Sequence, residues 1–196
     1  MKYLYLNIIL IIIIFLTFSQ VDYSKTFSST KIATKKAIIP VNTPTPTPVI
    51  TSPIRLIVPK LSIDSLIEPV DVDTNNIVSV PDGWDKAGWY VKAVKPGEIG
   101  TAVIVGHYDN QFGQPAIFFY LNKLEVGDNI TIIDTEGHSL SFSISNIRST
   151  PNWSSMNSLY KEDNNKNLIL ITCSGWWNSA THNYSDRLVI EAILSN

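Results

Sequence analysis

The stretch Asn167-Leu-Ile-Leu-Ile-Thr-Cys173 decides the fold class, because four consecutive branched apolar residues are typical of a strand buried on both faces. The run ends at the only cysteine of the chain, directly before the loop-forming pair Ser174-Gly175. A single thiol displayed at a strand end is a candidate nucleophile, because the chain has no second cysteine with which it could form a disulfide.

Two other runs share this design. Thr101-Ala-Val-Ile-Val-Gly-His107 is an apolar run that ends in a histidine, and Asp186-Arg-Leu-Val-Ile-Glu-Ala192 is an apolar run that opens with an arginine. We therefore predict three strands that present Cys173, His107 and Arg187 at their ends.

The three side chains have complementary chemistry. A thiol attacks well only as a thiolate, and a neighbouring imidazolium lowers its pKa from the free value of ~8.5. A guanidinium keeps its proton, so Arg187 can stabilise a carbonyl oxygen as that oxygen becomes negative. The set suits acyl transfer through a thioester on Cys173, with His107 as general acid and base.

These residues resemble the sortase family, in which a strand ending in Thr-Cys and a strand opening with Arg lie beside a strand ending in Gly-His. The corresponding elements are Ile171-Thr-Cys173, Arg187-Leu-Val189 and Val105-Gly-His107. The chain order His, Cys, Arg also agrees, and the resemblance covers roughly residues 53 to 194.

Further segments support the resemblance and point to a subclass. They are Pro53-Ile-Arg-Leu-Ile-Val-Pro59, Gly88-Trp-Tyr90, Pro96-Gly97 and Pro115-Ala-Ile-Phe-Phe119. Together with Cys173-Ser-Gly175, the second and fourth of these look most like class F.

The resemblance implies a cysteine transpeptidase. Cys173 would cleave a Leu-Pro-x-Thr-Gly-like sorting signal of a secreted protein, and an amine of a peptidoglycan precursor or a pilin would take over the acyl group. Two alternatives stay open: a hydrolytic cysteine peptidase of the same fold, in which water replaces the amine, and a non-catalytic, surface-displayed binding barrel. An L,D-transpeptidase fits less well, because its Ser-His-Gly-Cys signature is absent.

Several residues near the three candidates have two interpretations each. Thr172 could help to bind the substrate carbonyl, and Trp176 and Trp177 could line the groove for the sorting signal or pack at a barrel rim. His182 lies in the predicted loop between Cys173 and Arg187, where it is either exposed or close to the site. Asp109 could orient the imidazole of His107 or point elsewhere.

The rest of the domain is predicted to consist of short strands separated by turns, because no long stretch repeats its apolar residues with the period of a helix. Strands are predicted at Arg55–Val58, Ser65–Val70, Ile77–Val80, Asn129–Asp134 and Leu140–Ile144 in addition to the three runs above. About eight strands are compatible with an all-β barrel or sandwich, and the resemblance implies the closed sortase β-barrel with short helical and loop insertions.

The N-terminal part differs in kind. Residues 1–19 contain an Ile-rich apolar segment that we expect to form an uncleaved membrane-anchoring helix, and residues 20–52 form a Thr/Pro-rich stalk too polar to fold. The catalytic domain is predicted at residues 53–196. Lysines after the segment favour a cytoplasmic domain, whereas the resemblance implies the extracellular face of the cell membrane, which we prefer.

Composition excludes some functions. The formal net charge is -2 and the domain lacks a Lys/Arg cluster, so nucleic-acid binding is not expected. The chain has no Cys-x-x-Cys or His-x-x-x-His pair and no Gly-rich phosphate loop. We expect neither a metal nor another cofactor.

Overall fold

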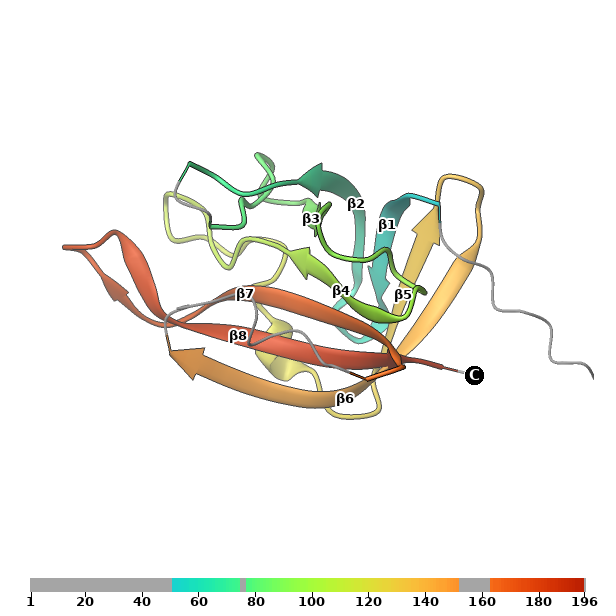
Figure 1. Ribbon diagram of the computed structural model, residues 1–196. Coiled ribbons are helices and arrows are strands. Elements are labelled where there is room, and N and C mark those ends of the chain that lie inside the picture. Colours follow the sequence, from blue (N-terminus) through green and yellow to red (C-terminus); the bar gives the residue numbers. More distant parts are fainter. Residues whose placement is uncertain (1–50, 75–76, 152–162, 196) are drawn as a thin grey trace, which may run out of the picture. The chain divides into compact units, whose positions relative to one another are not determined.

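The chain folds into a closed β-barrel. The structure, a computed structural model, describes residues 51–74, 77–151 and 163–195. Within these residues eight strands close in the order β1-β2-β3-β4-β7-β8-β6-β5 (Figure 1). The strands are β1 (Pro53–Val58), β2 (Ile63–Val70), β3 (Ala87–Tyr90), β4 (Gly100–Val105), β5 (Asn129–Asp134), β6 (Ser139–Pro151), β7 (Lys166–Asn178) and β8 (Asn183–Leu194). Two short 3₁₀ helices, Pro59–Leu61 and Leu121–Lys123, are inserted between strands.

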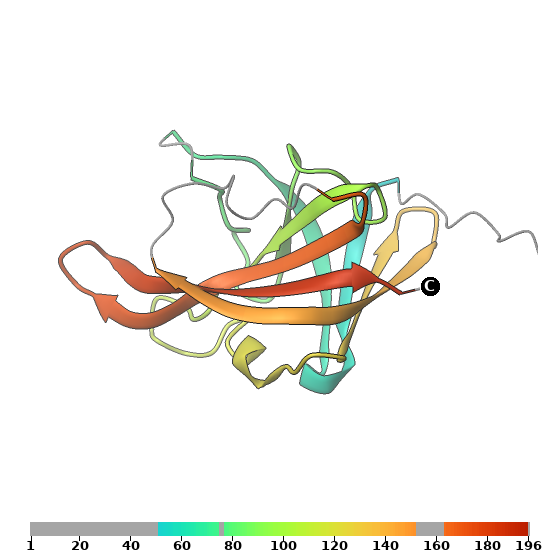
Figure 2. The same ribbon diagram turned by 60° about the horizontal axis from the view of Figure 1, so that its bottom comes forward.

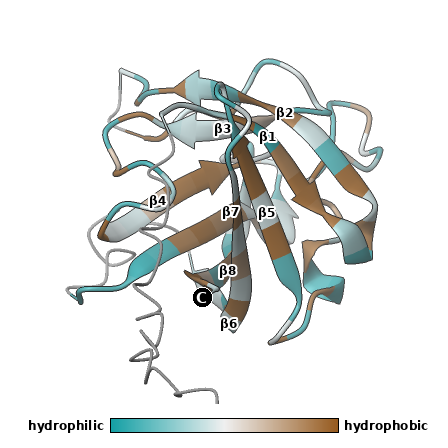
Figure 3. Cartoon of the chain, turned by 90° about the vertical axis from the view of Figure 1, so that its right-hand side faces the viewer, coloured by the Kyte–Doolittle hydropathy of each residue, from teal (hydrophilic) through white to brown (hydrophobic). Residues whose placement is uncertain are grey.

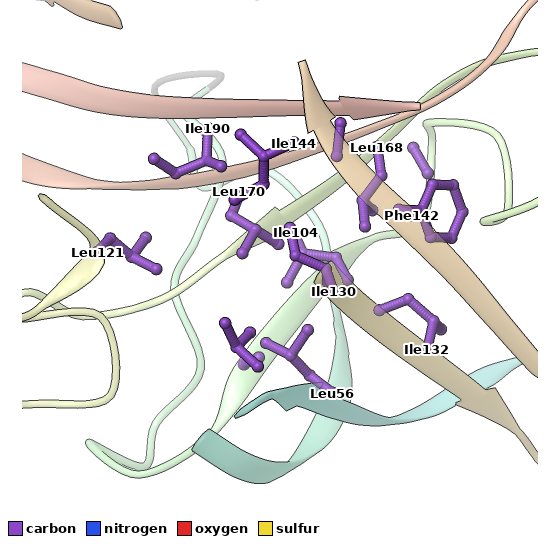
Figure 4. Packing of buried hydrophobic residues seen from close by; sticks show 14 of the residues in the cluster. Leu56, Ile104, Leu121, Ile130, Ile132, Phe142, Ile144, Leu168, Leu170 and Ile190 are labelled. Atoms are coloured by element: carbon purple, nitrogen blue, oxygen red, sulfur yellow. The ribbon is translucent and has the colours of Figure 1, made fainter. Parts of the chain in front are cut away.

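The barrel interior is filled by branched aliphatic and phenylalanine side chains, as the apolar runs predict. Figure 4 shows side chains of β1, β4, β5, β6, β7 and β8 converging on one core. Strand β5 alternates between buried and more exposed residues, and Figure 3 shows the hydrophobic and hydrophilic positions along it. Strands β1 and β5 each pair with a neighbour on both sides. Closure leaves these strands without the free edges that favour aggregation.

Strands β4, β7 and β8 are buried on both faces, which explains their continuous apolar sequence. Their inward residues, such as Ile104, Leu170 and Ile190, join the barrel core. Their outward residues belong to a second cluster, which the chain between β2 and β4 helps to cover. The members of this cluster are Val70, Tyr90, Val103, Val105, Ile169, Ile171 and Val189. The candidate site lies next to this second cluster, two residues further along the same face of β4, β7 and β8.

Besides β6, which runs over Ser139–Pro151 instead of the predicted Leu140–Ile144, two predictions of strand position were wrong. Residues Ile77–Val80 do not form a strand, since the only ladder contact there is an isolated bridge between Val72 and Val78. The strand lies instead at Ala87–Tyr90, where Gly88 allows close packing against Val70 and Val105. The pattern Ala-Gly-Trp-Tyr has small residues that hide its strand character from a search for apolar alternation.

The second error concerns the strand ends at the site. Strand β7 does not stop at Cys173 but continues to Asn178, with a register shift between Ser174 and Trp177 and a left-handed Gly175 at φ 83°. Strand β8 likewise begins at Asn183, four residues before Arg187. The two extensions form a hairpin, residues 174–186, which we call the arm; it reaches beyond the rest of the barrel in Figures 1 and 2.

The predicted N-terminal helix and the greater part of the stalk lie outside the described residues. Among the residues that are described, no helix is long and apolar enough to cross a membrane.

A substitution of Phe118 can test the packing of the core beneath the candidate site. Its ring is fully buried, and an added Cβ on Gly106 would come within 2.5 Å of it. We expect Phe118→Ala to lower the free energy of unfolding by about 3–5 kcal/mol, because the truncation leaves a cavity. The loss is measured by chemical denaturation.

Phe112 supplies the matched control, since it is 78% exposed in the neighbouring loop. We expect Phe112→Ala to change the free energy of unfolding by less than about 0.5 kcal/mol. Equal losses in the two variants would contradict the assignment of Phe118 to the core.

Candidate active site

Strand register brings the three candidate residues to one level of the sheet. Strands β4 and β7 are parallel, with Val105 level with Ile171, so His107 and Cys173 follow two residues later on each chain. Strands β7 and β8 are antiparallel, and Cys173 pairs directly with Arg187. Neighbouring strands are about 4.8 Å apart, so the backbones of the three residues lie side by side.

Alternation then sends the three side chains to the same face. Residues Val105, Ile171 and Val189 belong to the outer cluster, and the candidate residues lie two positions from them on β4, β7 and β8. Side chains two positions apart on a strand point the same way. His107, Cys173 and Arg187 therefore meet on the outer face, and all three are partly buried.

Thr172 lies on the opposite face. It is 3% exposed, and its hydroxyl donates a hydrogen bond of 2.9 Å to the carbonyl oxygen of Gly106. This bond links β7 to the residue that follows β4, one position before Cys173 and His107 on their respective chains. The suggestion that Thr172 contacts the substrate carbonyl is therefore not supported, and we assign it to holding the two strands together.

The imidazole of His107 has one nitrogen occupied. Its Nε2 lies 2.9 Å from the carbonyl oxygen of Pro81, and because a carbonyl only accepts, Nε2 carries a proton. The ring of Trp84 packs on the imidazole, with centroids 4.3 Å apart. Nδ1 is then the nitrogen free to exchange a proton with a reacting group.

Burial dominates the protonation of both titrating groups. It lowers the pKa of His107 below its usual ~6.5 and outweighs the hydrogen bond to Pro81 and the carboxylate of Asp109, which both raise that pKa. Burial also raises the pKa of the Cys173 thiol, Arg187 lowers it, and Asp109 raises it. At neutral pH the resting pair is therefore mainly an uncharged thiol and an uncharged imidazole.

Arg187 is held by its own strand. Its Nη1 donates to the carbonyl oxygens of Tyr184 (3.2 Å) and Asp186 (2.9 Å), and its Nη2 donates to Oδ1 of Asn183 (2.7 Å). Among the described residues Arg187 has no carboxylate partner within ion-pair distance. Within the part of the chain that the structure describes, no carboxylate neutralises this charge, and the guanidinium is placed to attract a substrate oxygen.

The arm carries the other sequence candidates. Trp176 is 64% and Trp177 50% exposed, and the ring of Trp177 contacts those of His182 and Tyr184. His182 is exposed in the hairpin turn, about 15 Å along the arm from Cys173 at a rise of ~3.3 Å per residue. This places His182 too far away to replace His107, and a role of Trp176 and Trp177 in substrate binding stays a prediction.

Asp109 does not bond to the imidazole. Its carboxylate instead accepts a short hydrogen bond from the hydroxyl of Tyr184 on β8. The third histidine, His138, lies apart from the site and hydrogen-bonds the buried Asp134 through Nδ1 at 3.0 Å. Of these residues, sequence reasoning missed Trp84, Asn183 and Tyr184, because nothing in their local sequence marks them.

A cofactor site is not evident in the described part of the chain. Residues 51–74, 77–151 and 163–195 contain no group of three or more His, Cys, Asp or Glu side chains that could hold a metal ion. A shallow hollow of about 340 Å³ is lined by the start of β2, by Trp84 and Asp85, and by residues 115–117, and it contains none of the three candidate residues.

Comparison with known proteins assigns the family. The sortase domain model matches residues 56–195, which is well over half of the chain. The chain belongs to the sortase family. Sortases are cysteine transpeptidases that act on proteins with sorting signals and on amine acceptors. A comparison with curated protein sequences finds no match.

Solved sortase structures share the fold at low sequence identity. Sortase C-1 from Actinomyces oris is 20% identical, with a TM-score of 0.57, over 73% of this chain and 71% of that chain. A lid mutant of sortase A from Corynebacterium diphtheriae is 22% identical, with a TM-score of 0.57, over 76% and 71%. The complex of Streptococcus agalactiae sortase C1 with MTSET is 20% identical, with a TM-score of 0.58, over 74% and 69%.

The charge of Arg187 should be visible in the reactivity of the thiol. We expect the alkylation of Cys173 by iodoacetamide to have its pH midpoint above ~8.5, because burial disfavours the thiolate. Arg187→Gln should move the midpoint further upward, since the cation that favours the thiolate is lost. The rate of alkylation is followed by mass spectrometry between pH 6 and about pH 11.

Arg55→Gln is the control, because it removes the same charge from an exposed ion pair with Asp64 on β1 and β2. It should leave the midpoint unchanged. A midpoint at or below that of a free thiol, or equal shifts in the two variants, would contradict the electrostatic description of the site.

Proposed function

We propose that this sortase cleaves a Leu-Pro-x-Thr-Gly-like sorting signal through a thioester on Cys173 and transfers the acyl group to an amine, with His107 and Arg187 as the other catalytic residues. The observation that carries the proposal is the common level and common outward face of these three residues on β4, β7 and β8. Acyl transfer needs a nucleophile, a proton carrier and an oxyanion partner within reach of one carbonyl group.

The first half-reaction acylates the enzyme. The thiol of Cys173 gives its proton to Nδ1 of His107, and the thiolate attacks the carbonyl carbon of the Thr-Gly bond. Arg187 binds the oxygen while it is negative. The C–N bond then breaks, the imidazolium returns a proton to the leaving amine, and the acyl group stays on sulfur.

The second half-reaction reverses these roles. An acceptor amine attacks the thioester carbon, His107 removes the proton that the amine loses, and the C–S bond breaks. The thiolate of Cys173 is protonated again, so the enzyme returns to its resting state with one new amide bond. A peptidoglycan precursor and a pilin lysine both supply such an amine.

The uncharged resting pair has a consequence for pH dependence. Activity requires one proton shared between Cys173 and His107, so we expect a bell-shaped profile of kcat/KM. The acid limb should lie below pH ~6.5, because the pKa of His107 is lowered, and the alkaline limb above pH ~8.5, because that of Cys173 is raised. A profile measured with a sorting peptide checks both limbs, and an acid limb above pH 7 would contradict this assignment.

The proposal of a finer class rests on sequence motifs, and the proposal of a location rests on the family resemblance. We assign the enzyme to class F on the motifs Gly88-Trp-Tyr90, Pro115-Ala-Ile-Phe-Phe119 and Cys173-Ser-Gly175. We further propose that residues 1–19 anchor the chain in the cell membrane and that residues 20–52 act as a stalk for a domain on the extracellular face.

The decisive experiment follows cleavage of a fluorogenic Leu-Pro-x-Thr-Gly peptide with and without oligoglycine. We expect the wild type to form an amide adduct, and Cys173→Ala to lose at least about a thousandfold in kcat/KM, because the nucleophile is gone. Thr181→Ala in the hairpin turn is the control for handling and folding, since its side chain is exposed.

The other outcomes separate the alternatives. Cleavage that depends on Cys173 but gives no adduct with any amine would indicate a hydrolytic peptidase. No turnover across a panel of sorting peptides, together with a Cys173 inert to alkylation, would indicate a binding barrel.

A further inference from the structure

Tyr184 connects two parts of the site that no strand pairing joins. It is the second residue of β8, within the arm, and its hydroxyl donates a hydrogen bond to the carboxylate of Asp109. Asp109 is two residues beyond His107 on the segment that follows β4. The side chain of Tyr184 therefore reaches across to the chain that carries the imidazole.

The backbone of the same residue holds the guanidinium. The carbonyl oxygen of Tyr184 accepts a hydrogen bond from Nη1 of Arg187, and its N–H donates to Oδ1 of Asn183 at 2.9 Å. That Oδ1 also accepts from Nη2 of Arg187. Any displacement of Tyr184 thus moves two of the three groups that orient Arg187.

Aromatic packing fixes the ring of Tyr184 on two sides. Tyr108 contacts it edge to face with centroids 5.4 Å apart, and Trp177 does so at 5.2 Å. Tyr108 is itself stacked on Phe119 at 4.5 Å. Such pairs limit the orientations of the ring, so the hydroxyl is aimed at Asp109 before any substrate arrives.

The arm needs this support, because it has few other partners. The pairing of β6 with β8 ends at Asp186, and the pairing of β4 with β7 ends at Ile171. Between Trp177 and Tyr184 the described chain is only a two-stranded ribbon, which is marginally stable alone. Among the described residues, the contacts of Tyr184 with Tyr108 and Asp109 tie the arm to the segment that follows β4.

We propose that Tyr184 and Asp109 form a clamp that sets the position of Arg187 relative to His107 and so determines how well the oxyanion is stabilised. The clamp rests on the proposed function, for which Tyr184 is a positioning residue and not a catalytic one. Its effect belongs to the transition state, because the guanidinium matters most when the carbonyl oxygen is negative.

The test is a double-mutant cycle in the full chain with Tyr184→Phe, Asp109→Ala and the double variant. Tyr184→Phe keeps the ring and removes only the hydroxyl. We expect it to lower kcat roughly tenfold, the scale of a hydrogen bond to a charged group, while KM for the sorting peptide changes less than about twofold. Asp109→Ala should cost much less in the Tyr184→Phe background than in the wild type.

Tyr120→Phe is the matched control. Its ring contacts Phe119 and Lys123, it is 46% exposed, and its hydroxyl makes no hydrogen bond among the described residues. We expect wild-type kcat from it. A Tyr184→Phe enzyme with wild-type kcat, or with a kcat loss that simply multiplies with that of Asp109→Ala, would overturn the clamp.

A second readout keeps the clamp testable if the proposed function fails. Amide hydrogen exchange in residues 174–186 should be faster in Tyr184→Phe than in Tyr120→Phe, because the arm has lost its tie to Asp109. A wild type without turnover on sorting peptides would refute the proposed function, yet faster exchange would still support the tie. Unchanged exchange would overturn the clamp whether or not the wild type is active.

Discussion

The site depends on one constraint, the register between β4, β7 and β8. Parallel pairing sets His107 level with Cys173, and antiparallel pairing sets Cys173 opposite Arg187. Because side chains alternate, a slip of one residue on any of these strands would turn its functional group into the barrel. The two apolar clusters on the two faces prevent such a slip, since each strand contributes to both.

Much of this arrangement could be predicted from the sequence, because the physical signal was local. The apolar runs within residues 101–107 and 167–173 are typical of strands with both faces covered, and each leads directly to a candidate side chain. The existence of a closed barrel was also predictable, with the help of the family resemblance. Strand β3 was not, because its sequence relies on Gly88 packing against Val70 rather than on apolar alternation.

The structural features that depend on contacts between distant segments could not be predicted from the sequence. The arm extends because Gly175 takes a left-handed conformation that lets β7 shift register and continue, whereas a Ser-Gly pair alone reads as a loop. Thr172 looked available to substrate until its hydroxyl was found bonded inward to Gly106. Trp84 and Tyr184 reach the site from other elements, so no spacing in the chain marks them.

The partial burial of Cys173 has a consequence beyond catalysis. Peroxides and other oxidants attack thiolates far faster than thiols, and the first product, a sulfenic acid, is lost from the reaction cycle unless it is reduced. A raised pKa keeps most Cys173 side chains in the slowly oxidised form between turnovers. The same desolvation that limits the amount of thiolate thus preserves the single sulfur on which the proposed cycle depends. This matters because the sequence has no second cysteine to resolve the damage.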